Sequence, residues 1–230
     1  MYRVINLLIF VCFTNLLVAQ KVRVEKVSQE FERFRNTTDF DYVHDDFDSS
    51  KIQWVADLTV KFDTVIPGML GECFLELKEK SNRFGANAFK VNNNDIFIYG
   101  NEKYISISCF FIRQENRAEN MALFNENSIY LFGFLAYHTE IEGYEVTLNE
   151  EEMIIGELSF RKYEYEDKED VNLLLGSKSR GAYESVKIEE GMKPKFYYFN
   201  MVKGSFKNAW IAEYDLFYGI YLSKILMKAS

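Results

Sequence analysis

The chain has 230 residues, of which 48% are hydrophobic, 17% aromatic and 27% charged. This composition excludes an intrinsically disordered chain, and a content of two prolines and 12 glycines excludes a collagen-like or proline-rich stalk. The formal net charge of −8 argues against a nucleic-acid partner, because phosphates require a basic protein face. Three cysteines are too few for a small disulfide-stapled scaffold.

The first 20 residues have the pattern of a secretory signal peptide. Arg3 precedes an apolar run at residues 4–19, and a charged, alternating segment follows. We expect cleavage after Ala19, which leaves Gln20 as the new N-terminus. An uncleaved anchor is the alternative, although the run is short for a membrane span of about 20 residues. The mature protein is therefore expected to be secreted or periplasmic, without an integral membrane span.

Strand patterns open the mature chain. A short alternating segment predicts a strand at Val22–Val24. Residues Ile52–Phe62 are the clearest strand, since every second side chain is apolar and only Val55 breaks the alternation. Ile96–Tyr99 and Tyr104–Ile112 predict an antiparallel pair of strands.

An amphipathic helix is predicted between these strands, over Met69–Phe84. Apolar and small residues recur there at helical spacing and define a buried stripe. The stripe consists of Leu70, Cys73, Phe74, Leu77, Ser81 and Phe84. Gly85 follows as the expected left-handed C-cap, and a strand resumes at Ala86–Val91.

The segment Leu75–Val91 resembles the helix-to-strand corner of YbjQ-like modules and of Rcs-type sensor lipoproteins of the bacterial envelope. The match consists of a lysine-rich helix followed by Gly85-Ala86-Asn87-Ala88 and an apolar strand, with Ser81 where alanine is usual. The resemblance implies close packing of helix and strand and carries no chemistry. The lipidated cysteine and paired disulfides of the sensor lipoproteins are not evident in this chain.

The second half of the chain has a different residue pattern. The polar run Arg113–Asn120 marks the expected boundary, and short aromatic runs separated by turn residues follow it. The last run, residues 215–229, fits a helix or a strand, and Gly219 favours the strand. The aromatic residues near the C-terminus are expected to be core residues, with a ligand-lining or partner-facing surface as the alternative.

These patterns predict an α+β protein in three parts. Residues 1–19 are a signal peptide. Residues 20–114 form a small module with one helix packed on a mainly antiparallel sheet. Residues 115–230 form a β-rich domain, either a sandwich or a partly closed barrel.

Two cysteines remain after cleavage, Cys73 and Cys109. Both lie on apolar faces of the first module, where the favoured interpretation is a pair of buried thiols. A disulfide is the alternative, since export would place them in an oxidising compartment.

The densest acidic cluster lies between residues 39 and 48. Asp41, His44, Asp45 and Asp46 are the candidate metal ligands, because carboxylates and imidazole bind Ca²⁺ or transition ions. The spacing of a calcium-binding loop is not met, so a solvated acidic loop is the competing interpretation. Phe40, Tyr42, Val43 and Phe47 interrupt the cluster as packing residues.

No catalytic or cofactor motif is recognised. His138 follows an aromatic strand without an identifiable partner. The run Gly176–Gly181 lacks the Lys-Ser/Thr pair that a phosphate-binding loop needs after its second glycine. We therefore expect no cofactor and favour a non-enzymatic binding or interaction protein of the bacterial cell envelope, whose partner is an envelope protein or a small molecule. The alternatives are a hydrolase-type enzyme with a site between the two domains and a metal-binding or metal-sensing module.

Overall fold

The computed structural model describes residues 21–29, 37–62, 67–92, 103–133, 143–156, 158–165, 170–175, 181–202 and 205–228. The predicted signal peptide, the strand Ile96–Tyr99 and His138 lie outside these residues, as does most of the run Gly176–Gly181. The elements are β1 (Lys21–Val27), β2 (Asp41–Tyr42), η1 (Ser49–Lys51), β3 (Ile52–Phe62), α2 (Pro67–Arg83), β4 (Ala88–Val91), β5 (Lys103–Ile112), α3 (Gln114–Ala122), β6 (Ser128–Gly133), β7 (Gly143–Leu148), β8 (Glu151–Gly156), β9 (Ser159–Glu164), β10 (Asp170–Leu175), β11 (Ala182–Lys187), β12 (Lys195–Val202), β13 (Ser205–Glu213), α4 (Leu216–Ile225) and β14 (Met227–Lys228).

The first sheet has the strand order β1-β3-β5-β4-β2, and all its pairs are antiparallel except β2 with β4. The strand predicted at Ile52–Phe62 is confirmed as β3. Its break in alternation has a structural cause: the register with β5 shifts between Trp54 and Ala56. This β-bulge at Val55 lets two successive side chains, Val55 and Ala56, both be buried.

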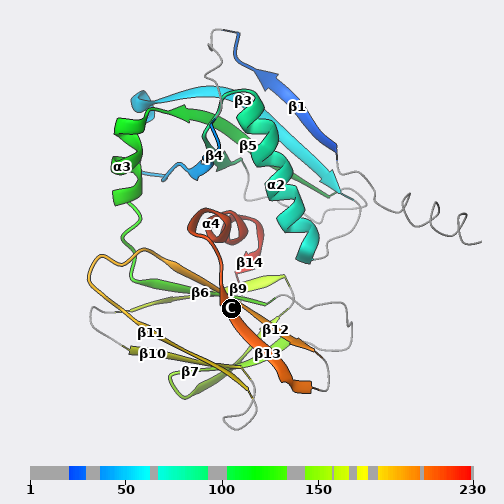
Figure 1. Cartoon of the computed structure of the whole chain (residues 1–230), viewed down its shortest axis with the longest axis vertical. Coiled ribbons are helices and arrows are strands. Elements are labelled where there is room, and N and C mark those ends of the chain that lie inside the picture. Colours follow the sequence, from blue (N-terminus) through cyan, green and yellow to red (C-terminus); the bar gives the residue numbers. More distant parts are fainter. Residues whose placement is uncertain are drawn as a thin grey trace, which may run out of the picture.

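Helix α2 covers one face of this sheet (Figure 1). Its predicted stripe is confirmed, since Leu70, Cys73, Leu77 and Ser81 are all buried. The helix ends before Gly85, which has a φ of 85°. A Cβ would be strained in this left-handed conformation, so glycine is the natural C-cap. The buried small residues that follow allow β4 to pass close to the helix.

The second half of the chain contains a four-stranded sheet, β11-β10-β7-β8, and a five-stranded sheet, β13-β12-β6-β9-β14. The two sheets pack through a shared cluster, to which Leu131 and Phe199 contribute from one sheet and Ile155 and Leu173 from the other. Each sheet ends in two edge strands, so no sheet of the described residues closes into a barrel. The expected α+β, strand-rich class is confirmed, and the described residues contain no closed barrel.

The C-terminal run is helix α4, so the strand favoured by the sequence is wrong for most of it; only β14 is extended. Asp215 caps the helix, because its carboxylate accepts hydrogen bonds from the backbone N–H groups of Phe217 (3.0 Å) and Tyr218 (3.4 Å). Gly219 brings the helix close to β12, and this close approach is the reason for a glycine within the helix. A Cβ at Gly219 would lie 2.1 Å from Cγ of Phe196.

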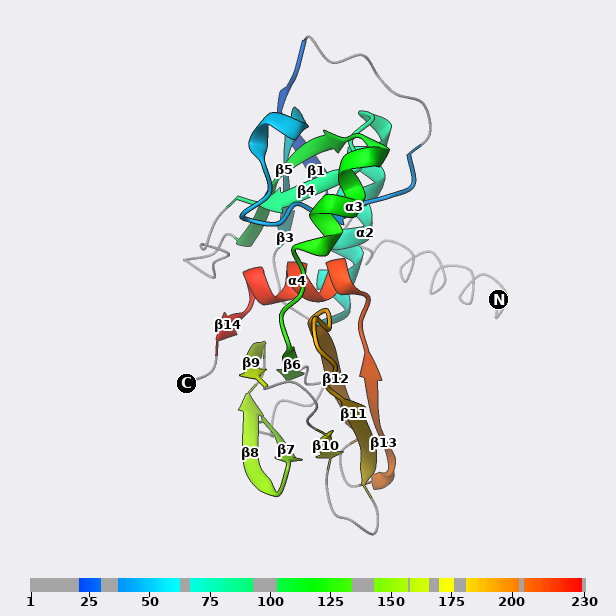
Figure 2. The same ribbon diagram turned by 90° about the vertical axis from the view of Figure 1, so that its left-hand side faces the viewer.

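Helix α4 lies between the first sheet and the five-stranded sheet, as both views show (Figures 1 and 2). It packs on Phe74 of α2 through Tyr218 and Tyr221, with ring centroids 5.1 and 5.0 Å apart. On the other side, Phe196 belongs to the same hydrophobic cluster. One core therefore runs from the first sheet through α4 to the five-stranded sheet.

The polar run at which the sequence places the boundary is largely helical, since residues 114–122 form α3. Among the described residues, no helix combines the length and the apolar character that a membrane crossing requires.

Because Phe196 is fully buried, Gly219→Ala should push α4 away from β12. Alanine gains about 1 kcal/mol of helix propensity, but overpacking outweighs this gain, so we expect a net loss of about 2 kcal/mol in the free energy of unfolding. Urea denaturation measures it. Gly71→Ala in α2 is the control, since its Cβ would meet only the end of the Tyr218 side chain at 3.3 Å. Equal stability of Gly219→Ala and wild type would contradict the close approach.

Candidate functional site

The acidic cluster contains a folded segment held against α3. The four predicted packing residues Phe40, Tyr42, Val43 and Phe47 are all buried, so their predicted role is confirmed. Strand β2 lies parallel to β4, and it turns the alternate side chains of Asp41 and Tyr42 to opposite sides.

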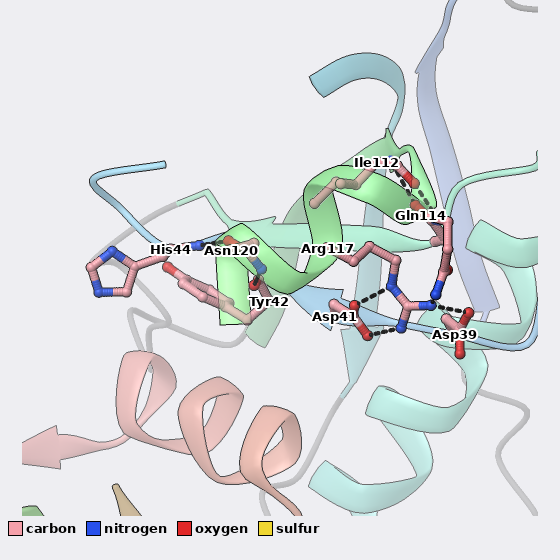
Figure 3. A network of polar contacts seen from close by, with 9 residues as sticks. Asp39, Asp41, Tyr42, His44, Ile112, Gln114, Arg117 and Asn120 are labelled. Atoms are coloured by element: carbon pink, nitrogen blue, oxygen red, sulfur yellow. Dashed lines mark hydrogen bonds and ion pairs between the residues drawn. The ribbon is translucent and has the colours of Figure 1, made fainter. Parts of the chain in front are cut away.

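Asp41 is bound by an arginine of α3 (Figure 3). Arg117 donates from Nε and Nη2 to the two carboxylate oxygens of Asp41 at 2.6 and 3.0 Å, and from Nη1 to Asp39 at 2.6 Å. Hydrogen bonding to Asp41 raises the pKa of Arg117 above its ordinary value. Both oxygens of the buried Asp41 therefore already have a cationic partner.

Asn120, a fully buried residue of α3, holds the next part of the segment. Its side chain accepts a hydrogen bond from the backbone N–H of His44 at 2.9 Å and donates one to the carbonyl of Tyr42 at 2.8 Å. The imidazole of His44 points away from Arg117 and Asp41 (Figure 3). Its Nδ1 accepts a hydrogen bond from the backbone N–H of Asp46 at 3.2 Å.

Asp45 pairs with cations from two other elements. Its carboxylate lies 2.9 Å from Nζ of Lys224 in α4 and 4.0 Å from Nζ of Lys90 in β4. Burial alone would raise the pKa of Asp45, but the hydrogen bond and charge of Lys224, and then the charge of Lys90, outweigh it and lower the pKa. Of the four candidate metal ligands, only His44 and Asp46 lie together, with Nδ1 of His44 3.8 Å from a carboxylate oxygen of Asp46. No group of three metal-ligating side chains forms within the described ranges.

The two cysteines are buried thiols in one hydrophobic cluster. No disulfide joins Cys73 and Cys109, so the disulfide alternative is not found. Burial raises the pKa of each thiol to about 12, which makes both poor nucleophiles.

A surface pocket of about 500 Å³ lies where β6 begins and β9 ends. Its lining is polar and consists of Glu126, Asn127, Ser128, Lys162, Glu164 and Tyr165. The antiparallel pairing sets Ser128 opposite Glu164 and Tyr130 opposite Lys162. These four residues lie on the same face of the sheet as Phe132 and Phe160, which belong to the same two strands. Phe132 and Phe160 are part of the hydrophobic cluster around α4. The pocket therefore adjoins the junction between the two parts of the chain.

Lys162 is the central charge of this pocket. Its Nζ lies 2.7 Å from a carboxylate oxygen of Glu164, 3.1 Å from one of Glu126 and 5.7 Å from the ring centroid of Tyr130. Burial would lower the pKa of Lys162, but the hydrogen bonds to Glu164 and Glu126 outweigh it and raise the pKa. Burial raises the pKa of Tyr130 to about 12, so both groups keep their protons at neutral pH.

Sequence reasoning missed this pocket, because its residues come from separate segments. The available signal was the i, i+2 spacing of Lys162 and Glu164, which places both on one face of a strand. The pairing with β6 that adds Glu126 and Ser128 is a long-range contact without a local signal.

Comparison with known proteins identifies no relative: no protein-family model, curated protein or solved structure matches the chain.

Asn120→Ala should destabilise the protein, because it leaves the N–H of His44 and the carbonyl of Tyr42 without their partner. Unsatisfied buried groups cost about 1–3 kcal/mol, and we expect a loss of about 2 kcal/mol in urea unfolding. Asn116→Ala is the matched control, since Asn116 makes only a 3.4 Å hydrogen bond from the same helix. A loss no larger than that of the control would argue against this anchor.

Because the pKa of both thiols is raised in the folded protein, we expect its free energy of unfolding to fall at alkaline pH. The folded protein keeps both thiols protonated, whereas the unfolded chain ionises above the ordinary thiol pKa of 9.0. Their contribution to stability is therefore complete below that pH and is lost as the pH rises toward 12.

We expect no reaction of the native protein with a thiol reagent at pH 8 and reaction of both residues in urea. Rapid labelling of either cysteine in the native state would contradict their burial.

Proposed function

We propose that this chain is an exported, non-enzymatic binding protein of the bacterial cell envelope, and that the pocket between β6 and β9 is its ligand site. The pattern of residues 1–20 supports export. The observation that carries the binding function is the polar pocket of about 500 Å³ around Lys162. Its volume falls in the range of about 300–1,000 Å³ that is typical of small-molecule sites.

The charged and polar side chains that border the pocket support a small ligand that carries polar groups. Two carboxylates, one ammonium group, a serine and an asparagine border the pocket, and Tyr165 is its aromatic residue. The side chain of Asn127 accepts a hydrogen bond from the backbone N–H of Met192 at 3.2 Å, which fixes its orientation. Such preorganised groups favour binding because they lose little freedom when a ligand arrives.

Observations on the two alternatives from the sequence are limited to the described residues. The hydrolase-type alternative places an unrecognised site between the two domains, and neither Cys73 nor Cys109 is suited to be its nucleophile, because burial raises the pKa of each thiol to about 12. A metal site at the acidic cluster needs available carboxylates, whereas Asp41 and Asp45 are paired with Arg117 and Lys224.

The proposal predicts binding at the pocket of the mature protein, which begins at Gln20. A panel of free amino acids, monosaccharides and small amines is titrated at millimolar concentration, and backbone amide shifts are followed by NMR. At least one compound should shift the amides of Ser128 and Lys162. Glu164→Lys should abolish these shifts, because it reverses an exposed charge at the rim without disturbing the core.

Glu145→Lys, on β7 of the other sheet, makes the same change of charge away from the pocket and should leave binding intact. A panel without any effect on the pocket amides would refute the binding function. Secretion is assessed separately by intact mass measurement from the native host, where a retained leader would refute export.

A further inference from the structure

We infer that this chain associates with itself head to tail, and that the outer face of its first sheet receives helix α2 of a second copy. The outer face is the side of β1, β3, β5 and β4 that lies opposite α2 (Figure 1). This contact does not involve the pocket between β6 and β9, and it goes beyond the proposed function. Two surfaces of opposite charge, on the two sides of the first sheet, support it.

The strand register places cations on the outer face. On the inner face, Leu58 of β3 is buried in one cluster with Leu77 of α2. Residues of β3 that alternate with Leu58 therefore point outward, and residues directly opposite them on the neighbouring strands point the same way. The cations placed on the outer face in this manner are Arg23, Lys26, Lys61 and Lys90.

This face is basic although the chain as a whole is acidic, with 35 acidic and 27 basic residues. Against the four cations, the described register sets one carboxylate, that of Asp57. Asp57 accepts hydrogen bonds from Nε1 of Trp54 at 3.0 Å and from Oγ of Ser108 at 2.6 Å, so it is held within the face. Lys90 lies 4.0 Å from Asp45, and the other three cations are exposed.

Helix α2 presents the opposite charge on its solvent side. Glu72, Leu75, Glu76 and Glu79 have the spacing i, i+3, i+4, i+7, so they form one stripe away from the buried side of the helix. Leu75 is 63% exposed, and Glu79 pairs with Arg83. Burial, and then the charges of Glu72 and Glu79, raise the pKa of Glu76. A basic surface that covers this stripe would relieve the repulsion between its like charges.

The two surfaces also match in size and in apolar contact. Glu72 and Glu79 lie about 10 Å apart along the helix. The cations extend from β1 to β4, which are three strand spacings or about 14 Å apart. Tyr104 is paired with Lys61 on the outer face and is 38% exposed, so its ring is available to Leu75. A second copy therefore offers charge, an apolar side chain and dimensions that fit the outer face.

The arrangement of the two surfaces determines the kind of assembly. Because they lie on opposite sides of one sheet, each contact uses the outer face of one copy and α2 of the next. Every copy at an end then keeps one unused surface, so the contact is heterologous and gives an open row of molecules. One helix on one sheet face is a small interface, and we expect weak association with a Kd of about 100 µM.

Analytical ultracentrifugation of the mature protein, which begins at Gln20, tests this contact. The average mass should rise between about 10 µM and about 1 mM. Two double variants should each stay monomeric: Arg23→Thr with Lys26→Thr on the outer face, and Glu72→Gln with Leu75→Gln on the stripe. Threonine suits a strand and glutamine a helix, and circular dichroism checks that both variants are folded. Lys187→Thr, which removes an exposed cation from β11, should associate like wild type.

A mixture of the two double variants makes the test specific. Each variant keeps the surface that the other has lost, so an equimolar mixture should form assemblies of two chains and none larger. Wild-type protein that stays monomeric would overturn self-association and leave the basic face to another acidic partner. Double variants that associate like wild type, a mixture that stays monomeric, or a mixture that grows beyond two chains would also overturn the contact.

Discussion

The burial of helix α4 between the first sheet and the five-stranded sheet is the constraint on which the rest of the structure depends. Ile220 and Leu222 are buried at this junction, and each contributes about 2 kcal/mol by leaving water. Stacked rings of Tyr198 and Tyr214, 4.2 Å apart, extend the contact to β12. The ion pair of Lys224 with Asp45 adds a contact to the segment that α3 anchors. The last helix of the chain thereby joins the two halves of the sequence into one core.

Local patterns were sufficient where one segment alone determines its structure. The alternation in Ile52–Phe62 and the helical stripe before Gly85 give elements that the structure confirms, since each buries one regular face. The last run could not be resolved in this way, because it is apolar around its whole circumference and has no period to measure. Its helix depends on the Asp215 cap and on the contact of Gly219 with Phe196, and the second of these is a long-range feature.

In the candidate site, too, the sequence identifies residues by type but does not identify the long-range contacts that decide their role. The sequence identified Asp41, His44, Asp45 and Asp46 by residue type, but the cations that pair with Asp41 and Asp45, namely Arg117, Lys90 and Lys224, come from distant elements. These cations convert two plausible ligands into structural ion pairs. The pocket around Lys162 escaped sequence reasoning for the complementary reason: none of its residues is unusual alone, and strand pairing brings them together.

The two tryptophans allow a direct test of whether α4 unites the molecule, because Trp54 lies in β3 and Trp210 in β13. Urea unfolding is followed by fluorescence in Trp54→Phe, which reports on the five-stranded sheet, and in Trp210→Phe, which reports on the first sheet. The shared core predicts a single transition for each variant that coincides with the loss of circular dichroism. The contrary result is that the two tryptophans report well-separated transitions in their respective variants and that the loss of circular dichroism is biphasic. That result would contradict the shared core and show that the two halves fold independently.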